Sequence, residues 1–210
     1  MWCGVVLLLA VLSLQTGAAV PLNATDNDAV LENLDLNQTL GPWFSIGSAG
    51  DCFWFETLLG SSQMIKFILS ATEEKNKFTA LLVHKWNGSC VNLTVEYEYL
   101  GNQGHFKYIP PTGYDIEVAV QISHISYHEY AILAYDSRLA GRKTKSLALY
   151  GRTQKLKKEI IKKFKEVALK QRIPEDMILF LPEHGACTSW KPLPSFVFEG
   201  LRPTGTVPEE

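Results

Sequence analysis

The most constraining feature of this sequence is a succession of eight short segments with β-strand composition. Each is rich in β-branched and aromatic residues and is bounded by residues typical of turns. The segments span residues 43–49, 64–72, 77–86, 90–100, 104–108, 114–124, 129–136 and 145–151. Eight consecutive antiparallel strands are the number that closes into a small barrel able to hold one ligand. We therefore expect an all-β fold, an eight-stranded antiparallel up-and-down β-barrel over about residues 43–151.

The clearest alternation occurs in the sixth of these segments. Ile116, Val118, Val120 and Ile122 alternate with polar or small residues, which places four β-branched side chains on one face of a strand. This face points either into a ligand cavity or into a packed core, because β-sandwiches show the same alternation. The meander followed by one late helix favours the barrel.

That helix is predicted over about residues 154–170, with Thr153 as its N-cap. Apolar residues recur there at steps of three and four: Leu156, Ile160, Phe164 and Val167. The opposite face is rich in lysine, as expected for a helix packed on the flank of the barrel with a solvated outer face. A helix that addresses an acidic partner or a lipid surface is the alternative.

The N-terminus has the pattern of a secretory signal peptide, expected over residues 1–19. An apolar run at 5–14 is followed by the small residues of 16–19. This run is too short to span a bilayer and no later run is long enough, so we expect a secreted, extracellular protein without membrane insertion. A net charge of -2 gives no strong field to attract nucleic acid.

The rest of the mature chain divides into three parts. A polar arm is expected over residues 20–36, one domain over 37–187 and an extended, proline-rich tail over 188–210. Glycosylation is expected at asparagines that begin Asn-x-Ser/Thr triplets: Asn23, Asn37, Asn87 and Asn92.

Removal of the signal peptide would leave three cysteines, Cys52, Cys90 and Cys187. At most one intramolecular disulfide can then form. A bridge between Cys90 and Cys187 would close a loop of about 100 residues, worth roughly 4 to 5 kcal/mol in the chain-entropy model. Cys52 would then remain for a disulfide-linked protein partner, a redox or ligand-anchoring role, or an inert thiol; its acidic neighbour Asp51 argues for sluggish thiol chemistry.

No other motif predicts catalysis. The histidines lack metal-ligand spacing, and the sequence contains no phosphate-binding loop, nucleophile elbow or zinc signature. We therefore predict no enzyme activity, no catalytic residue, no metal site and no required cofactor.

Three separated stretches resemble the signature regions of the lipocalins, in the same order and spacing. They are Gly41-Pro42-Trp43, residues 124–131 and Leu149-Tyr150-Gly151-Arg152. The resemblance covers about residues 37–187 and implies a lipocalin calyx with the C-terminal helix on its flank. It further implies that Arg152 stacks over Trp43 to seal the closed end, and that Cys90 and Cys187 form the family's disulfide.

This resemblance implies binding and transport of a small hydrophobic ligand, such as a retinoid, fatty acid, steroid or haem-like molecule. Alternation and the family register predict the inward-facing ligand contacts to be Val118, Val120, Ile122, Leu133 and Tyr135.

Within the family, residues 47–54 are similar to the alpha-1-microglobulin and complement C8 gamma branch, which carries an unpaired cysteine just past the first strand. That similarity implies an alternative function, a thiol-dependent interaction or redox and haem-scavenging role through Cys52, with His124 as a haem contact. Residues 149–154 also resemble the prostaglandin D synthase branch. Its nucleophilic cysteine belongs on the second strand, where residues 64–72 contain none, so isomerase activity is not predicted.

Overall fold

Eight antiparallel strands follow one another along the chain, as the sequence predicts. The computed structural model describes residues 33–50, 64–86, 88–101, 104–109, 116–139, 141–183, 186–187, 189 and 191–192. The strands are β1 (Gly41–Gly50), β2 (Lys66–Ala71), β3 (Lys77–Trp86), β4 (Ser89–Tyr99), β5 (His105–Ile109), β6 (Ile116–Ser126), β7 (Tyr130–Leu139) and β8 (Arg142–Gly151). The predicted segment 77–86 coincides with β3, and the other strands begin or end one to three residues away from their predicted bounds.

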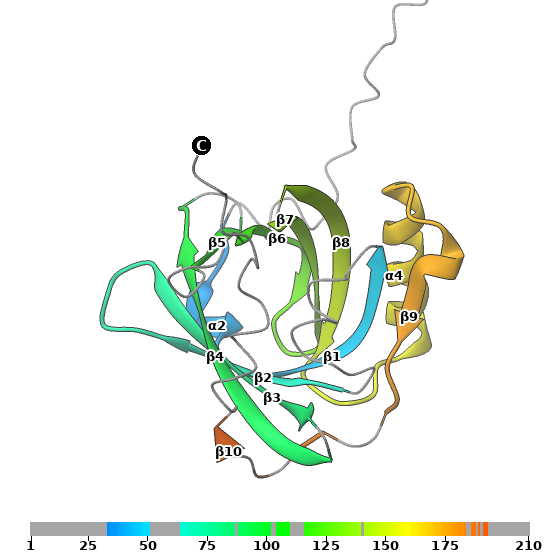
Figure 1. Ribbon diagram of the computed structural model, residues 1–210. Coiled ribbons are helices and arrows are strands. Elements are labelled where there is room, and N and C mark those ends of the chain that lie inside the picture. The colour runs from blue at the N-terminus through cyan, green and yellow to red at the C-terminus, as the bar shows by residue number, and fades with distance from the viewer. Residues whose placement is uncertain are drawn as a thin grey trace, which may run out of the picture.

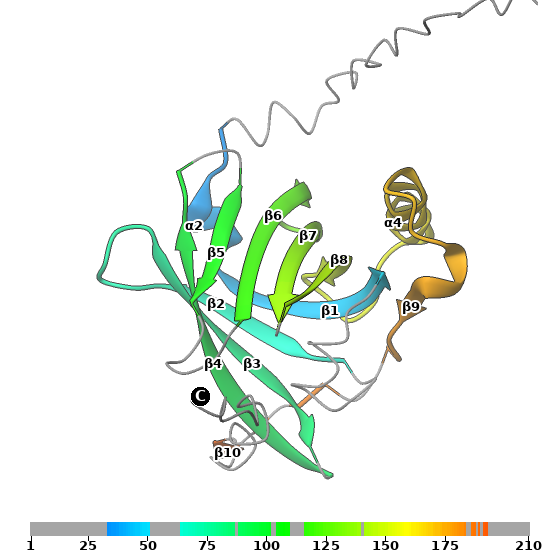
Figure 2. The ribbon, with the colours of Figure 1, turned by 45° about the horizontal axis from the view of Figure 1, so that its top comes forward.

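The sheet closes because β1 pairs with two strands at once. Its first half, from Gly41 to Phe44, pairs with β2, and its second half, from Phe44 to Gly50, pairs with β8. Every other strand pairs with its neighbours in the chain, including β4 with β5. Figures 1 and 2 show the resulting ring of strands, which confirms the predicted up-and-down barrel.

The helix α4 (Lys158–Lys170) packs on the outside of this ring, against β1, β7 and β8 (Figure 2). These three strands are apolar on both faces, because one face lines the barrel and the other lies under the helix. Phe164 and Leu149, both 0% exposed, belong to this outer cluster, while Tyr150 belongs to the inner one. The predicted position of the helix on the barrel flank is therefore confirmed.

The start of α4 differs from the prediction by four residues. Lys157 is the N-cap and makes no side-chain capping bond, so the predicted N-cap at Thr153 is wrong. The Thr153 hydroxyl instead donates to the carbonyl of Lys155 at 2.8 Å. Leu156 packs against the outer core and lies close to Gly151, which holds this segment against the barrel before the helix begins.

Shorter elements complete the described chain. They are α2 (Leu36–Thr39), the 3₁₀ helix η1 (Glu175–Met177), β9 (Ile178–Phe180) and β10 (Lys191–Pro192). β9 pairs antiparallel with β1. The parallel pairing of β10 with β4 was not predicted. The predicted signal peptide, most of the arm and most of the tail lie outside the described residues, so these boundaries stay predictions.

Candidate functional site: an apolar cavity above a sealed floor

The closed end of the barrel is built around Trp43, which is 6% exposed. The guanidinium carbon of Arg152 lies 3.7 Å from the centre of the indole ring, which confirms the predicted stacking. The indole nitrogen of Trp43 donates to the carbonyl of Thr39, 2.7 Å away at the end of α2. The indole is therefore fixed by contacts on its face and at its edge.

Arg152 also ties three chain segments together through its guanidinium. It donates to four backbone carbonyls: Tyr127 at 2.7 Å, Leu40 at 2.9 Å, Pro42 at 3.0 Å and Gln38 at 2.6 Å. Partial burial lowers the pKa of Arg152 from its ordinary value, because it removes water from the charged group. The floor is thus a hydrogen-bonded plug joining α2, the start of β1 and the turn between β6 and β7.

The glycine of the Gly-x-Trp pattern has a conformational role in this floor. Gly41 has φ = +91°, a region that residues with a Cβ adopt only at a cost. This turn directs the chain from α2 into β1 and places the carbonyls of Leu40 and Pro42 toward Arg152.

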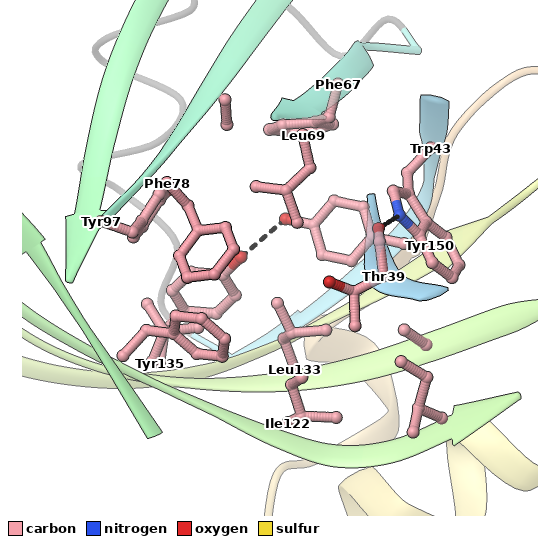
Figure 3. Close-up of a pocket in the computed structure, with 15 residues that line it drawn as sticks. Thr39, Trp43, Phe67, Leu69, Phe78, Tyr97, Ile122, Leu133, Tyr135 and Tyr150 are labelled. Carbon is pink, nitrogen blue, oxygen red and sulfur yellow. Dashed lines mark hydrogen bonds between the residues drawn. The ribbon is translucent and has the colours of Figure 1, made fainter. Parts of the chain in front are cut away.

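A cavity of about 110 Å³ lies inside the barrel above this floor (Figure 3). Its aromatic lining consists of Trp43, Phe67, Phe78, Phe106 and three tyrosines, Tyr97, Tyr135 and Tyr150. The remaining lining residues are Thr39, Leu69, Ala80, Val120, Ile122, Ile125, Ala131 and Leu133. Pockets for drug-sized ligands measure roughly 300–1,000 Å³, so a ligand of that size would require lining side chains to move.

The tyrosines supply the main polar groups of the cavity wall. The hydroxyls of Tyr135 and Tyr150 are hydrogen-bonded at 2.7 Å (Figure 3). Burial raises the pKa of Tyr97 well above its ordinary value, and the neighbouring Tyr135 and Tyr108 raise it further. The phenol of Tyr97 is therefore protonated and neutral at physiological pH.

Four of the five predicted ligand contacts line this cavity: Val120, Ile122, Leu133 and Tyr135. The fifth, Val118, is 2% exposed and belongs to the inner core, but it is not among the residues that line the cavity. Sequence reasoning missed the aromatic wall contributed by β2 to β5. The alternation of Phe78, Ala80 and Leu82 along β3 was the available signal for part of it.

His124 is not among the residues that line the cavity, and its role as a haem contact stays a prediction. The pairing of β6 with β7 shifts between Ile122 and His124, which marks a β-bulge. Strict alternation from Ile122 would put His124 on the inner face, but the extra residue puts Ile125 there instead. The Nδ1 atom of His124 lies 3.0 Å from the Ser123 hydroxyl.

The predicted disulfide between Cys90 and Cys187 is present, with their Cα atoms 5.7 Å apart. It links the start of β4 to the chain that follows β9, next to the pairing of β10 with β4.

Cys52 lies outside the described residues, as do Asn23 and Asn87. Asn37 is exposed on α2, whereas Asn92 is half-buried on β4 between Val83 of β3 and Pro192 of β10. Glycosylation at these sites stays a prediction.

None of the described helices is long and apolar enough to cross a membrane. No group of three or more histidine, cysteine, aspartate or glutamate side chains that could hold a metal ion occurs in this part of the chain.

Comparison with known proteins places this geometry in a family context. The family model described as the lipocalin / cytosolic fatty-acid binding protein family matches residues 40–185. Protein AMBP of Bos taurus is 29% identical over 211 residues, which cover 99% of this chain and 59% of the relative. This chain therefore spans less than two thirds of that relative's length.

Two other proteins match over most of their own length. Prostaglandin-H2 D-isomerase of Mus musculus is 30% identical over 189 residues, covering 89% of this chain and 95% of the relative. A solved structure of the siderocalin Ex-FABP has a TM-score of 0.58 at 17% identity, over 74% of this chain and 97% of that one. The likeness to that structure shows the shared fold.

Proposed function

Because the chain belongs to the lipocalin / cytosolic fatty-acid binding protein family, we propose that it binds and carries a small hydrophobic ligand inside its barrel. The observation that carries this proposal is the apolar cavity above the Trp43 floor. Ligand pockets are typically concave and apolar, with a few polar groups that orient the ligand. Retinoids, fatty acids, steroids and haem-like molecules are the classes to be tested.

The carrier is proposed to act outside the cell. The expected signal peptide over residues 1–19 supports this location. The disulfide between Cys90 and Cys187 supports it independently, because disulfides persist mainly in oxidising compartments.

Filling the cavity should abolish binding. Ala80 on β3 lines the cavity and is 4% exposed, so the ring in Ala80→Phe would occupy ligand space. We expect affinity for any bound ligand to fall by about 30-fold or more, measured by fluorescence titration of protein stripped with organic solvent. Ala119→Phe is the matched control, because Ala119 is exposed on β6.

Two outcomes would contradict the carrier function. One is that native mass spectrometry of protein from its own source, an organic extract and a ligand panel all show no bound molecule. The other is that Ala80→Phe, folded as judged by circular dichroism, binds as tightly as the wild type.

A second candidate function is a thiol-dependent one through Cys52, either a covalent link to another protein or a redox and haem-handling role. It is favoured by the pairing of Cys90 with Cys187, which leaves Cys52 as the remaining cysteine once Cys3 is removed with the signal peptide. The similarity to Protein AMBP over 99% of this chain also supports it.

This second function predicts a larger species on non-reducing gels of protein from its natural source. We expect reductant to convert that species to the monomer. Cys52→Ser should abolish it, while Cys3→Ser should leave it unchanged. A source protein that migrates as a monomer with and without reductant would exclude the covalent link.

An isomerase activity is not proposed, although a relative carries the name Prostaglandin-H2 D-isomerase. In that branch of the family the nucleophilic cysteine lies on the second strand. Residues 66–71 of β2 read Lys-Phe-Ile-Leu-Ser-Ala and contain no cysteine.

A further inference from the structure

The cavity is lined without a single formally charged side chain. Its described lining contains no aspartate, glutamate, lysine, arginine or histidine, and its main polar groups are phenol hydroxyls. We propose that the barrel selects uncharged ligands, apolar molecules whose polar end is a hydroxyl or carbonyl group, over carboxylates of the same size. This inference rests on the proposed carrier function and narrows its ligand class.

A carboxylate inside this cavity would lose its water without gaining a counterion. Burial of an ionised group is costly unless an opposite charge or several hydrogen bonds replace the lost water. Tyr97 shows the same effect, because burial raises the pKa of its phenol, which means that this interior disfavours the charged form. The interior that disfavours the phenolate would disfavour a carboxylate for the same reason.

A neutral polar group, in contrast, finds a suitable partner on the wall. Tyr97 lines the cavity, and its phenol can donate one hydrogen bond and accept two. The hydroxyls of the neighbouring Tyr135 and of Tyr150 are hydrogen-bonded to each other at 2.7 Å. A ligand hydroxyl or carbonyl that reaches Tyr97 would therefore be oriented by a neutral hydrogen bond.

One buried histidine faces the barrel interior outside the cavity lining. His84 continues the inward alternation of Phe78, Ala80 and Leu82 along β3 and is 0% exposed. Neither of its ring nitrogens has a hydrogen-bond partner within the described part of the chain, and burial lowers the pKa of His84. The imidazole is therefore neutral at physiological pH and supplies no counterion there.

Cations at the open end of the barrel are the other source of a counterion. Arg138 pairs with Glu117 at 3.2 Å, and Lys145 pairs with Asp136 at 3.2 Å. Arg142 is exposed at the start of β8, four residues from Ser146, which pairs with Tyr135. At about 3.3 Å per residue, Arg142 lies roughly 13 Å along the strand from the level of Tyr135.

The segments that connect β1 to β2 and β5 to β6, residues 51–63 and 110–115, contain three acids and neither lysine nor arginine. Among the described residues, Arg142 and Lys143 at the start of β8 and Lys85 near the end of β3 are the other cations at this end of the barrel.

The test compares matched ligands on the full mature chain after solvent stripping. The probes are 1-decanol, decanoate and decane as a compact set, and retinol with retinoate as a longer pair. At neutral pH we expect each alcohol to bind at least about 30-fold more tightly than its carboxylate. Tyr97→Phe should weaken decanol binding about 3- to 10-fold and leave decane binding unchanged. Tyr99→Phe on the same strand is the control, because Tyr99 does not line the cavity.

The outcomes separate this proposal from the carrier function. If neither the alcohols, the carboxylates nor decane bind, and the source protein and the ligand panel show no bound molecule either, the carrier function itself is overturned. If the carboxylates bind as tightly as the alcohols, the carrier function stands and selection for uncharged ligands is overturned. Loss of that carboxylate binding in Arg142→Gln would locate the counterion at the open end, and its loss in His84→Gln would locate it inside.

Discussion

Arg152→Ala is expected to lower the free energy of unfolding by about 2 to 4 kcal/mol. The guanidinium stacks 3.7 Å from the indole centre of Trp43 and donates to four carbonyls, three within residues 38–42 and one in the turn between β6 and β7. Removing it exposes one face of Trp43 and leaves those carbonyls without their charged donor. Because the plug closes the barrel end, we also expect water to reach the cavity floor and ligand affinity to fall.

Urea denaturation followed by far-UV circular dichroism measures this effect. Arg152→Lys should recover less than half of the loss, since a lysine lacks the planar fork that reaches several carbonyls at once. Arg138→Ala is the control, because Arg138 is exposed and makes one surface ion pair with Glu117, worth less than about 1 kcal/mol. Equal effects of Arg152→Ala and Arg138→Ala would show that the floor does not depend on the Arg152 contacts.

The barrel could be predicted from the sequence because each strand contributes one face to the interior, which preserves a period of two. The bounds were least accurate where strands are polar. β7 ends three residues later than predicted and includes Ser137 and Arg138. β8 begins three residues earlier than predicted and includes Lys143, so both strands extend toward the turn at Gly141. Their pairing with each other holds these polar residues in the sheet, and composition does not report that pairing.

The site was predictable only in part, for a related reason. Alternation along β6 and β7 identified Val120, Ile122 and Tyr135 as inward-facing, and all three line the cavity. A β-bulge after Ile122 interrupts the period of two, so His124 does not face the cavity. An alternating sequence pattern does not predict such a bulge. Val118 also faces inward, but it packs in the core and does not line the cavity. Alternation predicts which face a residue lies on and not how it packs there.

The aromatic wall was missed because its members come from strands distant in sequence. Phe67, Phe78, Tyr97 and Phe106 lie on β2, β3, β4 and β5, one from each strand. Their convergence depends on the register of three successive pairings, and a single sequence does not specify those registers. The pairing of β10 with β4 was missed for the same reason, since it depends on the disulfide that brings Cys187 to Cys90.

Removing that disulfide is expected to have the largest effect on stability of any change considered for this chain. The two cysteines are 97 residues apart, and the chain-entropy model assigns a loop of that length about 4 to 5 kcal/mol. In the double variant Cys90→Ala/Cys187→Ala the unfolded chain regains this freedom, and the segment after β9 loses its covalent attachment to β4. We expect a lower urea midpoint and increased proteolysis near residues 178–192, because β9 and β10 are short strands that depend on this attachment.

Cys52→Ala is the matched control, since it removes a thiol without opening the bridge. It should leave the free energy of unfolding within about 0.5 kcal/mol of the wild-type value, because the bridge stays intact. Dithiothreitol should shift the midpoint of the wild type toward that of the double variant and leave the double variant unchanged. A double variant as stable as the wild type would mean that pairing of β1 with β9 and packing of α4 hold the C-terminal segment without the bridge.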